Sequence, residues 1–102
     1  MVKLVAMYKQ PKDPAAFDRH YREVHLPLAR KMPGVKRIEL SRFTGTPVGS
    51  DAPFYFMAEI YFDNADAARA ALGSPEGKAA GKDIMSVAGD IILMMNADVE
   101  EA

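Results

Sequence analysis

An apolar helical pattern with a proline inside it constrains the fold of this chain more than any other feature. Four residues recur at spacings of four, three and four, as on one face of an α-helix: Phe17, Tyr21, Val24 and Leu28. Pro27 lies within this pattern, where its missing amide and its crowding of the Glu23 carbonyl cost about 3 kcal/mol. The segment is therefore either a bent core helix or a helix that is broken to serve a site.

Capping and turn residues divide the rest of the 102-residue chain into strands and helices. Three pairs are typical helix starts: Asp13-Pro14, Asp63-Asn64 and Ser74-Pro75. They predict helices over residues 14–32, 65–72 and 75–88, the first of which ends at Pro33-Gly34. Runs of β-branched and aromatic residues predict four strands, at 2–8, 35–44, 54–62 and 90–96.

This βαββαβ order, with its second helix split, predicts an α+β fold of the ferredoxin-like type. In that fold four antiparallel strands form one sheet, and the helices pack on one of its faces. We expect a single domain over residues 1–102, with an acidic, solvated tail from about 97 to 102.

Composition argues against several classes of function. The chain has no cysteine, which rules out disulfides, thiolate catalysis and thiolate metal sites. Its net charge is −1 and it has no long basic run, so we expect no nucleic-acid partner. No apolar run is long enough for a membrane span, and we expect a cytoplasmic protein. Nucleotide and phosphate-loop motifs are missing, so no cofactor is predicted.

The strand at 54–62 is apolar on both of its faces. Phe56, Ala58 and Ile60 alternate there with Met57 and Tyr61. One face packs under the helices, and the other is too apolar to face water. We therefore expect a second sheet from an identical chain to cover it, which predicts a homodimer with a barrel-like core.

The two histidines of the chain both lie in the first helix. His25 is next to the irregularity at Pro27, where an imidazole could act as a general acid or base near neutral pH. It could equally be a boundary residue that repairs the helix by hydrogen bonding. His20 is expected at the rim. Because five residues separate the two, on opposite sides of the apolar stripe, we predict no shared metal site.

The remaining candidates are four tyrosines and one acid. Tyrosine suits a pocket because its body is apolar and its hydroxyl needs a partner. The predicted substrate-binding residues are Tyr8, Tyr21, Tyr55, Tyr61 and Glu59. Glu59 is included because it lies in mid-strand, where a carboxyl group can be buried. The tyrosines could also be ordinary core and strand residues, and Tyr55 and Tyr61 could face the partner in a dimer.

Several groups of residues occur together in a recognisable order. They are Tyr8 with Pro11, the run Phe17-x-x-x-Tyr21-x-x-x-His25-x-Pro27-Leu28-Ala29, then Met32-Pro33-Gly34, and later Ser74-Pro75-Glu76-Gly77. This order resembles the EthD (ethyl tert-butyl ether degradation) family, a branch of the dimeric α+β barrels. The resemblance covers nearly the whole chain.

The resemblance implies a ferredoxin-like chain, a homodimer and a pocket histidine at His25. The wider superfamily includes lactone isomerases, cofactor-free monooxygenases, polyketide cyclases and haem-degrading enzymes. The last group uses a site that contains tryptophan, and this chain has none.

The leading hypothesis is a small enzyme without metal or cofactor that acts on an apolar or aromatic carbonyl compound in a catabolic pathway. His25 would move the proton, and Tyr8, Tyr55 or Tyr61 would orient an oxygen. The chemistry would be of the isomerase, cyclase or monooxygenase type. Two alternatives are a non-catalytic small-molecule-binding or accessory protein and a haem binder with His20 or His25 as axial ligand.

Overall fold

The computed structural model of the protein describes residues 1–102 and has one four-stranded sheet covered by helices. The strands are β1 (Val2–Tyr8), β2 (Arg37–Arg42), β3 (Phe56–Phe62) and β4 (Ile92–Asp98). The helical segments are α1 (Pro14–His20), the π-helical turn η1 (Tyr21–His25), α2 (Leu26–Arg30), α3 (Ala65–Gly73) and α4 (Pro75–Ala88). This order confirms the predicted ferredoxin-like fold with a split second helix.

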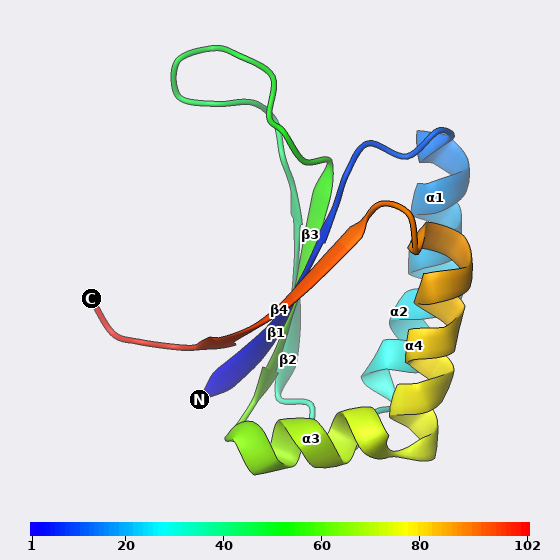
Figure 1. Cartoon of the computed structure of the whole chain (residues 1–102), viewed down its shortest axis with the longest axis vertical. Coiled ribbons are helices and arrows are strands. Elements are labelled where there is room, and N and C mark those ends of the chain that lie inside the picture. Colours follow the sequence, from blue (N-terminus) through cyan, green and yellow to red (C-terminus); the bar gives the residue numbers. More distant parts are fainter.

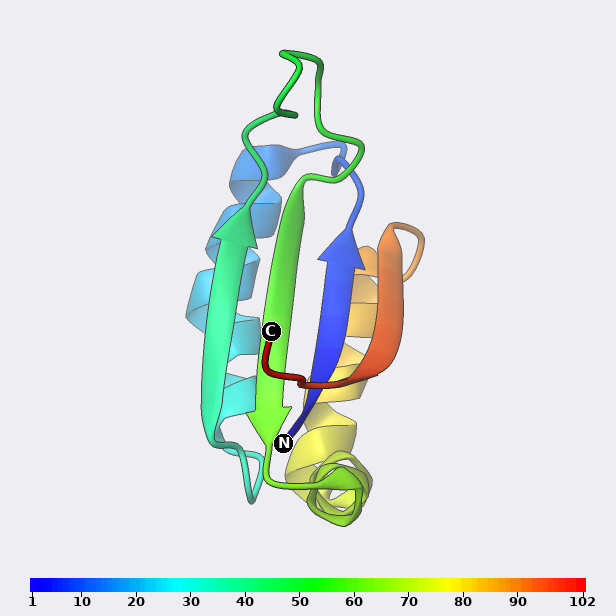
Figure 2. The ribbon, with the colours of Figure 1, turned by 90° about the vertical axis from the view of Figure 1, so that its left-hand side faces the viewer.

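The sheet has the strand order β2-β3-β1-β4, and every neighbouring pair is antiparallel. All helices lie on one side of it (Figure 1). The opposite face carries no helix, and Figure 2 looks directly onto it. At the end of β1, Tyr8 lies opposite Phe56 of β3 and Ile92 of β4. No helix is both long enough and apolar enough to cross a membrane.

The predicted helix starts are confirmed by their capping hydrogen bonds. The side chains of Asp13, Asn64 and Ser74 each accept a hydrogen bond from the backbone amide of the third residue of α1, α3 and α4, respectively. Strand ends differ more from the prediction. β4 continues to Asp98 because β1 begins at Val2, and the register pairs these two residues.

The helix that contains Pro27 has an irregular turn in place of a regular α-helix. At η1 the amide of Leu26 donates to the carbonyl of Tyr21, five residues back. The wider turn changes the angular positions of the residues within it and after it around the helix axis. The prediction that Val24 belongs to the buried stripe was therefore wrong: Val24 is 42 % exposed, whereas His25 and Leu26 are buried.

Aromatic packing holds this irregular helix against the sheet. The Tyr21 ring lies 4.9 Å from the Phe56 ring, and the Tyr8 ring lies 5.3 Å from the Phe17 ring, measured between centroids. All four side chains are buried. Burying a side chain of this size contributes about 1.5–3 kcal/mol, so the cluster fixes where η1 lies over β1 and β3.

Candidate functional site

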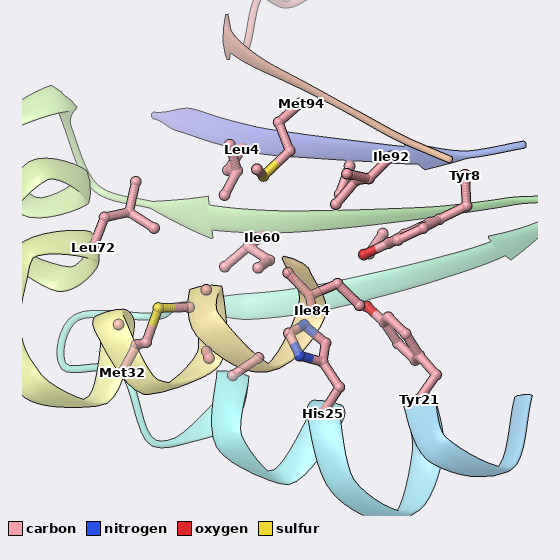
Figure 3. Close-up of a pocket in the computed structure, with 16 residues that line it drawn as sticks. Leu4, Tyr8, Tyr21, His25, Met32, Ile60, Leu72, Ile84, Ile92 and Met94 are labelled. Carbon is pink, nitrogen blue, oxygen red and sulfur yellow. The ribbon is translucent and has the colours of Figure 1, made fainter. Parts of the chain in front are cut away.

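The site is a cavity between the sheet and the helices, with a volume of about 70 Å³. Most of its lining is apolar, and it comes from β1, β3, β4, the first helix, α3 and α4. Figure 3 shows that Tyr8, Tyr21 and His25 gather toward one end, while Met32 and Leu72 lie at the other. The cavity therefore has one polar end and one apolar end. One water molecule needs a cavity of about 10–15 Å³, so this larger space fits a small organic group.

His25 contributes the only imidazole in the cavity lining. Its residue is 6 % exposed, and its Nδ1 lies 3.1 Å from Oδ2 of Asp83. Because a carboxylate only accepts hydrogen bonds, Nδ1 carries the proton and Nε2 keeps its lone pair. Every fully buried side-chain nitrogen or oxygen atom has a hydrogen-bond partner. Nε2 of His25 has no partner within the chain, so this atom must retain some accessible surface. This arrangement leaves Nε2 available to a ligand.

The surroundings of His25 keep its imidazole neutral. Burial lowers its pKa below the usual value, and the nearby His20 acts in the same direction. The Asp83 carboxylate opposes this through its hydrogen bond and its charge, but burial is the larger cause. A neutral imidazole at neutral pH can accept a proton, as a general base must.

Asp83 also binds His20. The Nε2 atom of His20 lies 2.9 Å and 3.1 Å from the two oxygens of Asp83, and its side chain is 30 % exposed. Sequence spacing had placed His20 and His25 on opposite sides of the apolar stripe, too far apart to share a ligand. That expectation was wrong, because the wide turn at η1 brings both rings to the same carboxylate. Asp83 is thus held from the solvent side by His20 and holds His25 on the cavity side.

Two of the predicted tyrosines, Tyr8 and Tyr21, lie in the cavity with His25. Their rings are 5.8 Å apart in an edge-to-face arrangement, and their hydroxyl groups face one another (Figure 3). Burial raises the pKa of Tyr8 far above its usual value and that of Tyr21 to about 12. Both hydroxyl groups therefore stay protonated at neutral pH and can donate a hydrogen bond to a ligand oxygen.

The other three predicted residues lie outside the cavity. The Tyr55 hydroxyl donates to the carboxylate of Asp18 at 3.0 Å. Tyr61 and Glu59 are on the sheet face that carries no helix, where Tyr61 donates to Glu39 at 2.7 Å and Glu59 pairs with Lys3 at 2.6 Å. Each of these side chains is satisfied by a polar neighbour within the chain.

Sequence reasoning missed Asp83. The residue precedes Ile84, which is one of the buried residues on the inner face of α4. The only local sign that the carboxyl group of Asp83 could be buried is its position beside the apolar face of the helix. That sign is weak, since most such residues face water. Its partners are 58 and 63 residues away in the chain, so spacing alone gives no indication of the contact.

Comparison with known proteins indicates that a single family accounts for nearly the whole chain. The family model described as the EthD domain matches residues 9–88. An uncharacterised 11.0 kDa protein from the thcB–thcC intergenic region of Rhodococcus erythropolis is 35 % identical over 100 residues, covering 98 % of this chain and 96 % of that protein.

Two solved structures extend the comparison to three dimensions. An EthD-family protein of Bacillus halodurans is 43 % identical, with a TM-score of 0.93 over 98 % of this chain and 99 % of that one. A hydroxynitrile lyase from Passiflora edulis is 18 % identical, with a TM-score of 0.77 over 99 % and 94 % of the two chains, and it shares the fold. Sequence, family model and structure agree, and the chain belongs to the EthD family.

Proposed function

We propose that this protein is a small acid–base enzyme that moves a proton on an apolar carbonyl compound bound in the cavity. The observation that carries the proposal is the contact between Nδ1 of His25 and Asp83, which leaves Nε2 as the free base of an apolar site. A carboxylate that orients an imidazole in this way fixes its tautomer and stabilises the cation it forms.

The proposed step uses the chain's own groups. Nε2 of His25 removes a proton from the carbon next to the substrate carbonyl. The C–H electron pair forms a C=C bond to the carbonyl carbon, and the C=O π pair moves onto the oxygen to give an enolate. The hydroxyl group of Tyr8 or Tyr21 donates a hydrogen bond to that oxygen. In a substrate whose C=C bond joins the β and γ carbons, the enolate is a dienolate, and the His25 cation returns the proton to the γ carbon. The C=C bond thereby moves into conjugation with the carbonyl, which completes an isomerisation.

The cavity suits this step because its lining is mostly apolar. Thirteen of its sixteen lining residues are hydrophobic, so the field of Asp83 and the tyrosine hydroxyl groups is weakly screened. A hydroxynitrile lyase has the same fold. That likeness supports only the idea that a chain of this shape can be an enzyme.

Exchange of carbon-bound hydrogen for deuterium tests the proposal whatever the final product of the reaction is. A panel of apolar ketones and lactones would be incubated with the protein in D₂O and followed by proton NMR. We expect His25→Gln to slow exchange of an accepted compound by about 10²–10⁴-fold, the usual range for a general base. We expect Asp83→Asn to slow the exchange as well, because the NH₂ group of an amide can donate to Nδ1 of His25 and so place the imidazole proton on Nε2.

A pair of tyrosine variants provides the matched control. Tyr21→Phe removes a hydroxyl group that lies in the cavity, and we expect it to lower the exchange rate. Tyr55→Phe removes a hydroxyl group bound to Asp18 outside the cavity, and we expect no change in rate. Compounds that bind in the cavity but never exchange would instead identify a non-catalytic binding protein.

We also propose that the protein works as a homodimer whose sheets pack face to face. The support is the sheet face that carries no helix, where Val5, Met7, Met57, Leu93 and Met95 alternate with inward-facing residues. Leu93 and Met95 are 45 % and 47 % exposed in the single chain. A contiguous apolar face of this kind in water is typical of a protein interface.

A further inference from the structure

A surface groove adjoins the cavity between α4 and β4. It has a volume of about 540 Å³, and it shares five lining residues with the cavity: Leu4, Leu72, Gly77, Gly81 and Met94. Of the shared residues, Leu4 and Leu72 lie toward the end of the cavity away from Tyr8 (Figure 3). The groove is therefore the mouth through which the cavity meets solvent.

Gly81 keeps this mouth open. A Cβ atom built at Gly81 would meet no other atom within 4 Å, although the residue lines both the cavity and the groove. Gly77, one turn earlier, differs, since a Cβ there would overlap the backbone carbonyl of Ala71. Gly77 allows α3 and α4 to approach, whereas the space at Gly81 is free for a ligand.

Two lysines of α4 flank the mouth, and each directly follows one of the two glycines. Lys78 and Lys82 both line the groove, are exposed, and lie one helical turn apart. Neither forms an ion pair with an acidic group within 4.0 Å, although five lysine or arginine pairs of this kind occur elsewhere in the chain. No acidic residue lines the groove. The entrance to an apolar cavity thus carries two positive charges without a partner.

From this juxtaposition we propose that the site takes an amphipathic carboxylate. The apolar body of the ligand fills the cavity, and its carboxylate lies at the mouth between Lys78 and Lys82. The reacting carbonyl reaches the opposite end, at Tyr8, Tyr21 and His25. Leu4 at the mouth and Tyr8 at the polar end are four residues apart on β1, a span of about 13 Å. The carboxylate and the carbonyl of the substrate are therefore at opposite ends of the molecule.

This inference rests on the proposed function, because it names the substrate class of the same site. Binding nevertheless tests it separately from catalysis. His25→Gln removes the proposed base and leaves the mouth intact, so that variant should keep its binding preference even though exchange is lost. Failure of one proposal is then visible without failure of the other.

Isothermal titration calorimetry with octanoate and octan-1-ol provides the test, since the two share a chain and differ in charge. We expect the wild-type protein to bind octanoate more tightly than octan-1-ol at neutral pH. Raising the ionic strength from about 0.01 M to about 1 M should weaken octanoate binding and leave octan-1-ol binding unchanged. Equal affinity for the two probes, or no binding of either, would overturn the proposal.

Two sets of variants locate the effect. Replacing Lys78 and Lys82 together by Gln should weaken octanoate binding about fivefold, which corresponds to two solvent-exposed ion pairs, and leave octan-1-ol unaffected. The control replaces Lys9 and Lys31 by Gln, which changes the net charge equally away from the groove. An equal loss in both double variants would show that only net charge matters.

Gly81→Leu tests the route itself. A leucine at this open position should fill the mouth and abolish binding of both probes while the fold is kept. Gly81→Ala is its control, because a single methyl group leaves most of the space free. Tight binding of octanoate to the leucine variant would place the ligand elsewhere and refute the assignment of the mouth.

Discussion

Asp83 determines what the two histidines can do. One carboxylate contacts Nδ1 of His25 and Nε2 of His20, so a single side chain sets the tautomer of His25 and ties it to the surface. Its loss would leave the His25 ring free to turn within the cavity. The chemistry of the site is therefore concentrated in a few atoms on η1 and α4.

Burial of His25 makes the stability of the protein depend on pH. Because burial lowers its pKa, the folded chain binds this proton less readily than the unfolded chain, whose histidine has a pKa of about 6.5. Between the folded pKa and about 6.5 the unfolded state carries more protons. The free energy of unfolding therefore rises with pH through this window and falls as the solution is acidified, by at most about 1.4 kcal/mol per pH unit.

Urea denaturation of the wild type and of His25→Gln between pH 5 and pH 7.5 measures this contribution. We expect the variant to lose the part of the slope that belongs to His25. The groups that face this ring are Asp83, His20 and Tyr21, and all three are kept in the variant. An unchanged slope in the variant would show that His25 does not titrate as described.

At this scale the sequence was informative about some residues and silent about others. His25 and Tyr21 could be predicted because they are four residues apart in one helix, beside an unusual proline. Asp83 could not, since its contact with His25 depends on how α4 crosses the first helix. Tyr61 and Glu59 were plausible by type, but side-chain alternation along β3 places them on the other face of the sheet.

The π-helical turn at η1 is the element that assembles the site. Pro27 has no backbone N–H to donate. The turn before it is π-helical, because the amide of Leu26 donates to the carbonyl of Tyr21, five residues back. Tyr21 and His25 both point into the cavity as a result (Figure 3). The sequence indicated an irregularity here, but its kind could be determined only from the structure.

The two glycines of α4 have opposite roles, and their alanine variants should show it. Gly81→Ala adds a methyl group in open space and removes a poor helix former, so we expect the free energy of unfolding to rise by about 0.5–1 kcal/mol. Gly77→Ala forces a methyl group against the backbone of α3, and we expect a fall of about 1–3 kcal/mol.

Urea denaturation of the two variants measures both effects in the same helix. Intrinsic helix propensity is the same in both substitutions, so it cancels from their difference. A change of the same sign in both variants would contradict the packing of α3 against α4.

Capping residues located the helices more accurately than side-chain alternation located the strands. The start of each helix depends on a local hydrogen bond, such as the one that Ser74 accepts at α4. The end of a strand depends on its partner, which lies far away in the chain. β2 is shorter than residues 35–44 because its pairing with β3 runs only from Arg37 to Arg42.

Taken as a whole, the sheet has one face that lines the candidate site and one that carries no helix. The proposed homodimer predicts that charge on the outer face prevents association. Replacing Leu93 and Met95 together by Lys should give a monomer in sedimentation velocity, because buried lysines without partners are strongly disfavoured. Val48→Lys, in the exposed loop between β2 and β3, is the control and should leave the dimer intact. A wild-type monomer at micromolar concentration would contradict the proposal.

The strand order β2-β3-β1-β4 also has a consequence for biosynthesis. β1 emerges from the ribosome about 90 residues before its outer neighbour β4, with which Val2 finally pairs at Asp98. The cavity has walls from both strands, so it cannot close before β4 has been synthesised. Until then β1 presents an open edge to the cell, and early contacts with a chaperone or a second nascent chain would occur there.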